Sequence, residues 1–328
     1  MKLWSKWVAL WSQREVPTML ALIRIFVGVV LLWDFVEIGL HDLPEVMWTP
    51  QELGGLPSNV LQRKVPPEIF TWIDPSPELA WGLWGLIILC LVLLILGIAT
   101  PVVGAILVLA YAQTSLILPL SDRGIDLLLR NVLMLLIFSK AGATLSLPAK
   151  LKTGSWLGDG QLHPSWPRYL IALQLVVMYF MAGVQKTALT WTPLGGYNAL
   201  YVILHDPHIA RMDWAGMGVL DAVSPFLRVG AATTHIFEWG APILVLALWF
   251  RYTRERPGRL RAFFLRWDVR LIWVVIGAVL HLGIAIAMQL GIFAWAMLAL
   301  YPAWFHPDEI QRLRQWWKEK RSKASSSA

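Results

Sequence analysis

The sequence predicts an all-α, polytopic membrane protein: a transmembrane helical bundle of about eight spans, with two longer outer segments between spans. The chain has 328 residues, of which 57% are hydrophobic and only 15% are charged, and its mean hydropathy is +0.58. Soluble domains carry about 25% charged residues. The 20 tryptophans point the same way, because Trp gathers at membrane interfaces. The composition therefore excludes an ordinary soluble protein.

The predicted spans come from runs of apolar residues, since a helix that crosses a bilayer needs about 20 of them. We expect breaks at Thr100–Pro101 and at Gly291, where two neighbouring stretches meet. At these two places short or re-entrant helices would give the same pattern. The eight stretches are 18–40, 78–99, 101–119, 125–140, 167–187, 229–250, 268–289 and 290–305.

Three regions are predicted along the chain. Residues 1–17, MKLWSKWVALWSQREVP, are basic and amphipathic, which is typical of an interfacial helix. Residues 18–306 form the transmembrane domain, and residues 307–328 form a basic cytoplasmic tail. The outer segments 41–77 and 188–228 are too long for simple turns, and loops of this length are often lids or binding loops.

The placement of positive charge predicts the orientation in the cell (inner) membrane. Twenty of the 28 Lys and Arg residues lie in segments 1–17, 140–168, 251–270 and 312–323. Positive residues mark cytoplasmic loops, so we expect both termini in the cytoplasm. Topology and anionic lipid headgroups then explain the net charge of +7, and we expect the bilayer, not nucleic acid, as the partner.

Nine ionisable residues fall inside or at the ends of the predicted spans, where such groups are costly and are functional candidates. With the predicted topology, eight of them lie at similar depth in the outer half of the bilayer. One explanation is a set of structural ion pairs between helices. The other is a polar cavity, open to the outer side, that supports chemistry or transport. The nine residues are Arg24, Asp34, Glu37, Asp126, Arg130, Lys186, His235, Glu238 and His281.

Helical spacing predicts contacts among these residues. Asp126 and Arg130 are four residues apart, and His235 and Glu238 are three apart, so each pair can share a face. A structural ion pair is the simpler interpretation of the first pair. The histidine spacings do not form a metal set, and we expect no metal.

Lys186 follows a mostly apolar run and has two interpretations. A lysine at the end of a span often extends its ammonium to the interface. A lysine desolvated in a cavity has instead a lowered pKa, which is what a general base near neutral pH requires.

The residues around Lys186 resemble a known family. Segment 179–191, YFMAGVQKTALTW, is similar to the YFxAGxxKxxxxW stretch of the vitamin K-dependent gamma-glutamyl carboxylases and their bacterial relatives, the HTTM membrane proteins. Segments 22–37, 123–138 and 281–309 resemble the first span, the fourth span and the late HxxxxxxxxxGxF stretch of the family, in the same order. The chain resembles the transmembrane module alone.

The resemblance implies a helical bundle whose active site opens to the outer side. In the carboxylases, reduced vitamin K and oxygen generate a strong base that removes a proton from glutamate before carbon dioxide adds. By position, Lys186 is the lysine that deprotonates the hydroquinone, and Asp126 occupies the approximate place of an assisting histidine. The predicted catalytic residues are thus Lys186 and Asp126. The pocket and supporting residues are Arg130, His235, Glu238, His281, Asp34, Glu37, Tyr179 and Trp191.

Three functional hypotheses follow. The first is a carboxylase-like enzyme that uses reduced vitamin K or menaquinol to modify an exported peptide or protein. The second is a peptide-maturation factor, or a quinone-linked redox membrane protein, that does not carboxylate. The third is a transporter or lipid-binding membrane component. Transporters often contain inverted repeats, and we find no repeat.

Overall fold

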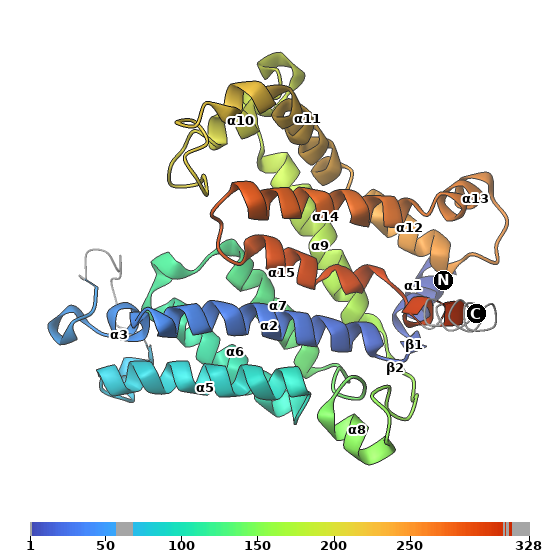
Figure 1. The fold of residues 1–328 in the computed structure, drawn as a ribbon. Coiled ribbons are helices and arrows are strands. Elements are labelled where there is room, and N and C mark those ends of the chain that lie inside the picture. Colours follow the sequence, from blue (N-terminus) through green and yellow to red (C-terminus); the bar gives the residue numbers. More distant parts are fainter. Residues whose placement is uncertain (1, 57–67, 311, 313–314, 317–328) are drawn as a thin grey trace, which may run out of the picture. The chain divides into compact units, whose positions relative to one another are not determined.

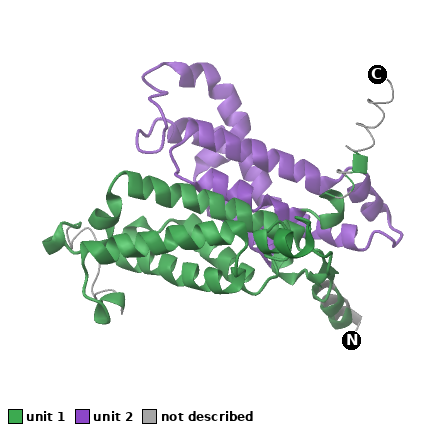
Figure 2. Cartoon of the chain, turned by 60° about the horizontal axis from the view of Figure 1, so that its bottom comes forward, with its two compact units in different colours: residues 1–169, 305–328 green, residues 170–304 purple. Residues whose placement is uncertain are grey.

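The computed structural model describes residues 2–56, 68–310, 312 and 315–316, and its regular secondary structure there is almost entirely helical (Figure 1). The chain divides into two compact units, coloured separately in Figure 2. Unit 1 contains residues 1–169 and 305–328, and unit 2 contains residues 170–304. Most of the tail predicted for residues 307–328 lies outside the described residues.

Unit 1 is built around four helices that lie side by side: α2, α5, α6 and α7 (Figure 1). Helix α2 packs on α5 and α7, and α6 also contacts both α5 and α7. The described elements are α1 (Lys2–Trp11), β1 (Arg14–Glu15), α2 (Thr18–Leu40), α3 (Leu43–Trp48), α5 (Pro77–Leu96), α6 (Thr100–Ile117), α7 (Gly124–Ile137), α8 (Leu147–Thr153) and β2 (His163–Pro164).

Unit 2 contains a long helix, α11, which contacts α10 and α14. Helix α14 in turn contacts α15. Two short 3-10 turns, Leu189–Trp191 and Pro193–Gly195, precede α10. The helices are α9 (Trp166–Gln185, which begins in unit 1), α10 (Ala199–Ile203), α11 (Val219–Trp239), α12 (Ile243–Tyr252), α13 (Arg259–Arg266), α14 (Val269–Ala287) and α15 (Phe293–Ala299), with a final turn at Tyr301–Trp304.

Five helices, α2, α5, α6, α9 and α14, are long and apolar enough to cross a membrane. Helices α11 and α12 together give a sixth candidate, bent by 57° where the chain passes through Gly240 and Pro242. The other two predicted spans contain the shorter helices α7 and α15. The all-helical membrane fold is thus confirmed, whereas the count of eight spans is not.

Both predicted breaks are confirmed. Helix α5 ends at Leu96 and α6 begins at Thr100, next to Pro101, which suits the first turn of a helix because its missing N–H has no partner there. Helix α14 ends at Ala287 and α15 begins at Phe293, on either side of Gly291. The proline and glycine signals placed these breaks correctly.

Arg24 lies in α2 and is fully buried. Its guanidinium donates to the carbonyl oxygens of Leu94, at 2.7 Å, and Leu145, at 2.6 Å. Leu94 belongs to the last turn of α5, whose carbonyl groups have no partner within the helix and favour a nearby cation. Arg24 therefore ties α2 to the end of α5 and to the loop before α8.

A second buried charge joins the two short strands of unit 1 to α9. Strands β1 and β2 pair antiparallel. The Arg168 guanidinium donates to both carboxylate oxygens of Glu15, at 2.6 and 2.7 Å, and both side chains are 2–3% exposed. His306 lies beside this pair, with Nε2 at 3.7 Å from a Glu15 oxygen. Burial lowers the pKa of His306 below its ordinary value, although the Glu15 charge opposes the shift.

We expect unit 1 to lose stability as the pH falls from 7.5 to 5.5. Because the folded-state pKa of His306 is depressed, its contribution is complete above the unfolded value of about 6.5 and is lost below it. The thermal unfolding midpoint, measured against pH, should fall less steeply for His306→Asn. One proton can change stability by at most about 1.4 kcal/mol per pH unit. An equal slope in wild type and variant would exclude His306 as the group responsible.

Candidate functional site

Lys186, directly after α9, forms an ion pair with Glu238 of α11. The Lys186 Nζ donates to Glu238 Oε1 at 2.7 Å, and the two side chains are 21% and 10% exposed. The same Nζ lies 5.0 Å from the centre of the Trp191 ring. The lysine is thus held between a mostly buried carboxylate and an aromatic face, rather than extended alone to the interface.

Gly183 permits this contact. A Cβ atom added at Gly183 would lie 3.0 Å from the Glu238 Cβ and 3.1 Å from the Trp239 backbone nitrogen. These distances are shorter than ordinary van der Waals contact, so α9 and α11 approach closely at this point. Lys186 follows Gly183 by three residues, close enough for its side chain to reach Glu238.

One turn before Gly183, Tyr179 takes part in a buried chain of hydrogen bonds. The Tyr179 hydroxyl lies 2.8 Å from His281 Nε2, on α14, and 3.1 Å from the Tyr301 hydroxyl. Aromatic rings surround this chain, with Phe237 centred 5.0 Å from Tyr179 and Phe293 centred 5.6 Å from His281. The result is a small polar cluster in an aromatic environment.

Gly277, one turn before His281, makes room for this cluster. A Cβ atom at Gly277 would collide with the Tyr301 hydroxyl and with the ring of Phe237. The hydroxyl therefore occupies space that any other residue would fill.

Four buried polar atoms of α11 and α14 have no hydrogen-bond partner within the part of the chain that the structure describes: Glu238 Oε2, His281 Nδ1, His235 Nδ1 and Trp273 Nε1. Glu238 is 8% exposed and His281 is 4% exposed. A buried polar atom without a partner costs about 1–3 kcal/mol. This region therefore offers a hydrogen-bond acceptor and a ring nitrogen to a small polar molecule.

The expected pairing of His235 with Glu238 is wrong, because Glu238 bonds to Lys186. His235 Nδ1 has no partner among the described residues, and its ring packs 6.2 Å from that of Trp239. The spacing of residues within α11 could not reveal that the partner of Glu238 follows α9.

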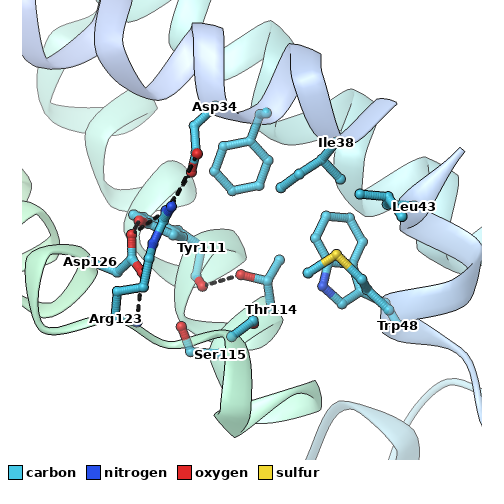
Figure 3. A pocket seen from close by; sticks show the side chains of 12 residues that line it. Asp34, Ile38, Leu43, Trp48, Tyr111, Thr114, Ser115, Arg123 and Asp126 are labelled. Atoms are coloured by element: carbon cyan, nitrogen blue, oxygen red, sulfur yellow. Dashed lines mark hydrogen bonds and ion pairs between the residues drawn. The ribbon is translucent and has the colours of Figure 1, made fainter. Parts of the chain in front are cut away.

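Unit 1 contains a separate cluster around a cavity of about 240 Å³. Arg123, directly before α7, donates to Asp34 Oδ2 at 2.6 Å and to Asp126 Oδ2 at 2.9 Å (Figure 3). The Tyr111 hydroxyl donates to Asp126 Oδ1 at 2.6 Å. The apolar part of the wall includes Phe35, Ile38, Leu43, Met47 and Trp48.

Asp126 is saturated with donors. Its Oδ1 accepts from Tyr111 and from Arg123 Nη2, and its Oδ2 accepts from the backbone N and Nε of Arg123. A carboxylate offers about four acceptor positions, and all four are used. This geometry suits a fixed anchor that begins α7 and orients Arg123. Because all four acceptor positions are occupied, neither carboxylate oxygen of Asp126 is available to take a proton from a substrate. Catalysis by Asp126 therefore stays a prediction that this geometry does not support.

The expected contact between Asp126 and Arg130 is also wrong. Arg130 donates instead to Asp122, at 2.8 Å, and to the Ser115 hydroxyl, at 2.5 Å. Asp126 is the third residue of α7 and turns back to cap its start, whereas Arg130 reaches the preceding loop. The two residues therefore belong to neighbouring ion pairs rather than to one.

Glu37 lies apart from both clusters. Its side chain is 53% exposed, and it accepts from Trp33 Nε1 at 3.2 Å and pairs with His41 at 3.5 Å. The sequence prediction omitted Tyr111, Arg123, Trp48 and Tyr301. Arg123 could have been found from its position three residues before Asp126 at the start of a helix, which is the spacing of a capping arrangement. No local sequence pattern marks Tyr111, Trp48 or Tyr301 as part of a site.

Comparison with known families identifies one of the regions described above. The model of the HTTM domain matches residues 13–212. The chain belongs to the HTTM family. The HTTM match contains Asp34, Asp126, Lys186 and Trp191, and it ends before Glu238 and His281. Neither the curated proteins nor the solved structures give a match to the chain.

Proposed function

We propose that this HTTM protein is a quinol- and oxygen-dependent membrane enzyme of the carboxylase type, acting on an exported peptide or protein. One observation supports this most. The distinctive residues of segment 179–191 all make contacts in a single region of unit 2. Tyr179 bonds to His281, Gly183 packs on Glu238, Lys186 bonds to Glu238, and Trp191 packs on Lys186.

The residues of this region fit a quinol headgroup. Such a headgroup is an aromatic ring with two hydroxyl groups, and ligand pockets are mostly apolar with a few convergent polar groups. Here the rings of Phe237 and Phe293 provide the apolar surroundings. The free atoms Glu238 Oε2 and His281 Nδ1 provide hydrogen-bonding capacity for hydroxyl groups.

In this proposal Lys186 and Glu238 act as one acid–base pair. The 2.7 Å hydrogen bond allows a proton to pass between Nζ and Oε1, and the buried Oε2 has no other partner among the described residues and can accept from a hydroxyl group. The Trp191 ring and the packing at Gly183 hold the pair in place. Reduced vitamin K or menaquinol would supply the electrons with which oxygen is reduced to a strong base.

The test is epoxide formation from vitamin K hydroquinone or menaquinol by the purified protein in lipid nanodiscs, followed by mass spectrometry. A glutamate-containing peptide and bicarbonate are present, and an anaerobic sample is the control. We expect oxygen-dependent epoxide from wild type and from Lys152→Ala, which removes an exposed lysine of α8, and none from Lys186→Ala.

The outcomes separate the hypotheses. Epoxide together with a carboxylated peptide supports the full proposal. Epoxide without carboxylation favours the quinone-linked, non-carboxylating alternative. Folded protein that forms no epoxide from any of these quinols overturns quinol oxygenation.

A further inference from the structure

Helix α13 lies between two apolar helices, α12 and α14, along the chain (Figure 1). It carries an exposed apolar stripe. Leu260 is 58% exposed, Phe263 is 53% exposed, and Trp267, directly after the helix, is 57% exposed. Their spacing of three and four residues places them on one face. Because α12 ends and α14 begins next to it, α13 lies at the boundary between apolar helices and water.

Positive charges accompany this stripe, and three of them have no carboxylate partner among the described residues. Residues 254–266 contain five arginines and one glutamate. Arg261 is used internally, since it donates to the Thr253 hydroxyl and to two carbonyl oxygens of the preceding turn. Arg254 pairs with Glu255. The other three, Arg256, Arg259 and Arg266, form no ion pair with any described residue. The Arg266 guanidinium lies 5.8 Å from the centre of the Trp267 ring, which leaves its charge without an anionic partner.

We propose that α13 and the turn before it bind an anionic phospholipid. Its headgroup phosphate pairs with Arg256, Arg259 and Arg266, and its acyl chains cover Leu260, Phe263 and Trp267. A zwitterionic lipid can cover the stripe, but the choline cancels the charge of its phosphate, so the arginines hold it less tightly. A free anion would pair with the arginines but leave the stripe in water. An anionic lipid does both, and Trp and Arg are residues that favour this interface.

The proposal predicts a selective loss of lipid affinity. Each arginine near a membrane surface contributes about a fivefold preference for anionic lipid. We therefore expect R256Q/R259Q/R266Q to retain phosphatidylglycerol about 100-fold less tightly than wild type. The measurement is native mass spectrometry after titration with phosphatidylglycerol. The control, K140Q/K152Q/R228Q, removes the same total charge from exposed positions elsewhere and should bind as wild type does.

A second readout reports the apolar stripe directly. Cys90 is the sole cysteine, so Phe263→Cys in a Cys90→Ala background accepts a single environment-sensitive dye. Its emission should shift to the blue in nanodiscs containing phosphatidylglycerol, relative to pure phosphatidylcholine. Equal affinity in the triple variant and its control would overturn the proposal. Displacement of the lipid by millimolar inorganic phosphate would also overturn it, since it would assign the site to a soluble anion.

Discussion

Replacing Lys186 by methionine is expected to lower quinol-dependent turnover by about 100- to 10,000-fold, the usual contribution of a positioned acid–base group. Methionine keeps the length and apolar stem of lysine but has no nitrogen to bond to Glu238 Oε1. Glu238→Gln removes the other half of the pair and should cause a loss of similar size. The measurement is the initial rate of epoxide formation, with thermal unfolding to confirm that each variant is folded.

The double variant shows whether Lys186 and Glu238 act together or independently. Residues that act together are strongly non-additive, so Lys186→Met/Glu238→Gln should be no slower than the slower single variant. Lys186→Arg keeps the positive charge, yet a guanidinium does not release its proton, so we expect it to fold normally and remain inactive. An active Lys186→Arg protein would assign Lys186 a purely electrostatic role and contradict acid–base chemistry.

The second large effect concerns stability. Glu15→Gln should destabilise unit 1 by about 3–5 kcal/mol, because it leaves the buried Arg168 charge without its carboxylate. The midpoint of thermal unfolding in detergent measures the change. Glu15→Gln/Arg168→Met should recover most of the loss, since replacing both partners removes the uncompensated charge.

The chain offers a matched control for this variant. Glu255 also pairs with an arginine, Arg254, but both side chains are exposed, at 89% and 55%. Exposed pairs contribute about 0–1 kcal/mol, so Glu255→Gln should leave the unfolding midpoint almost unchanged. If the two variants unfolded alike, the Glu15–Arg168 pair would have no special structural role.

The sequence predicted the apolar helices well because their signal is local. A span needs a run of apolar residues, and the runs at 18–40 and 101–119 became α2 and α6 with small changes at their ends. The same signal hid the bend between α11 and α12, since the stretch on both sides of Gly240 and Pro242 is apolar enough to be predicted as one span. It also placed the start of this span at residue 229, whereas α11 begins at Val219, inside the predicted outer segment 188–228.

The site was predicted less completely because its contacts join distant parts of the chain. Lys186 and Glu238 were both named, but 52 residues separate them, and no spacing rule connects two helices. Asp126 was assigned to Arg130 by helical spacing, whereas a capping interaction with Arg123 is stronger at the start of a helix. Sequence patterns thus identified most charged members of the site and misassigned several of their partners.

The anchoring of Arg24 constrains how the protein is made. Helix α2 is made before α5 and α8, and an arginine within a membrane helix costs up to about 2.5–3.5 kcal/mol in lipid. Its carbonyl acceptors at Leu94 and Leu145 follow 70 and 121 residues later. At about 5–20 residues per second, α2 must wait roughly ten seconds for the second of them. Nascent chains that end before Leu145 therefore carry an unsatisfied charge in the bilayer, a feature by which membrane quality control can distinguish incomplete chains from finished protein.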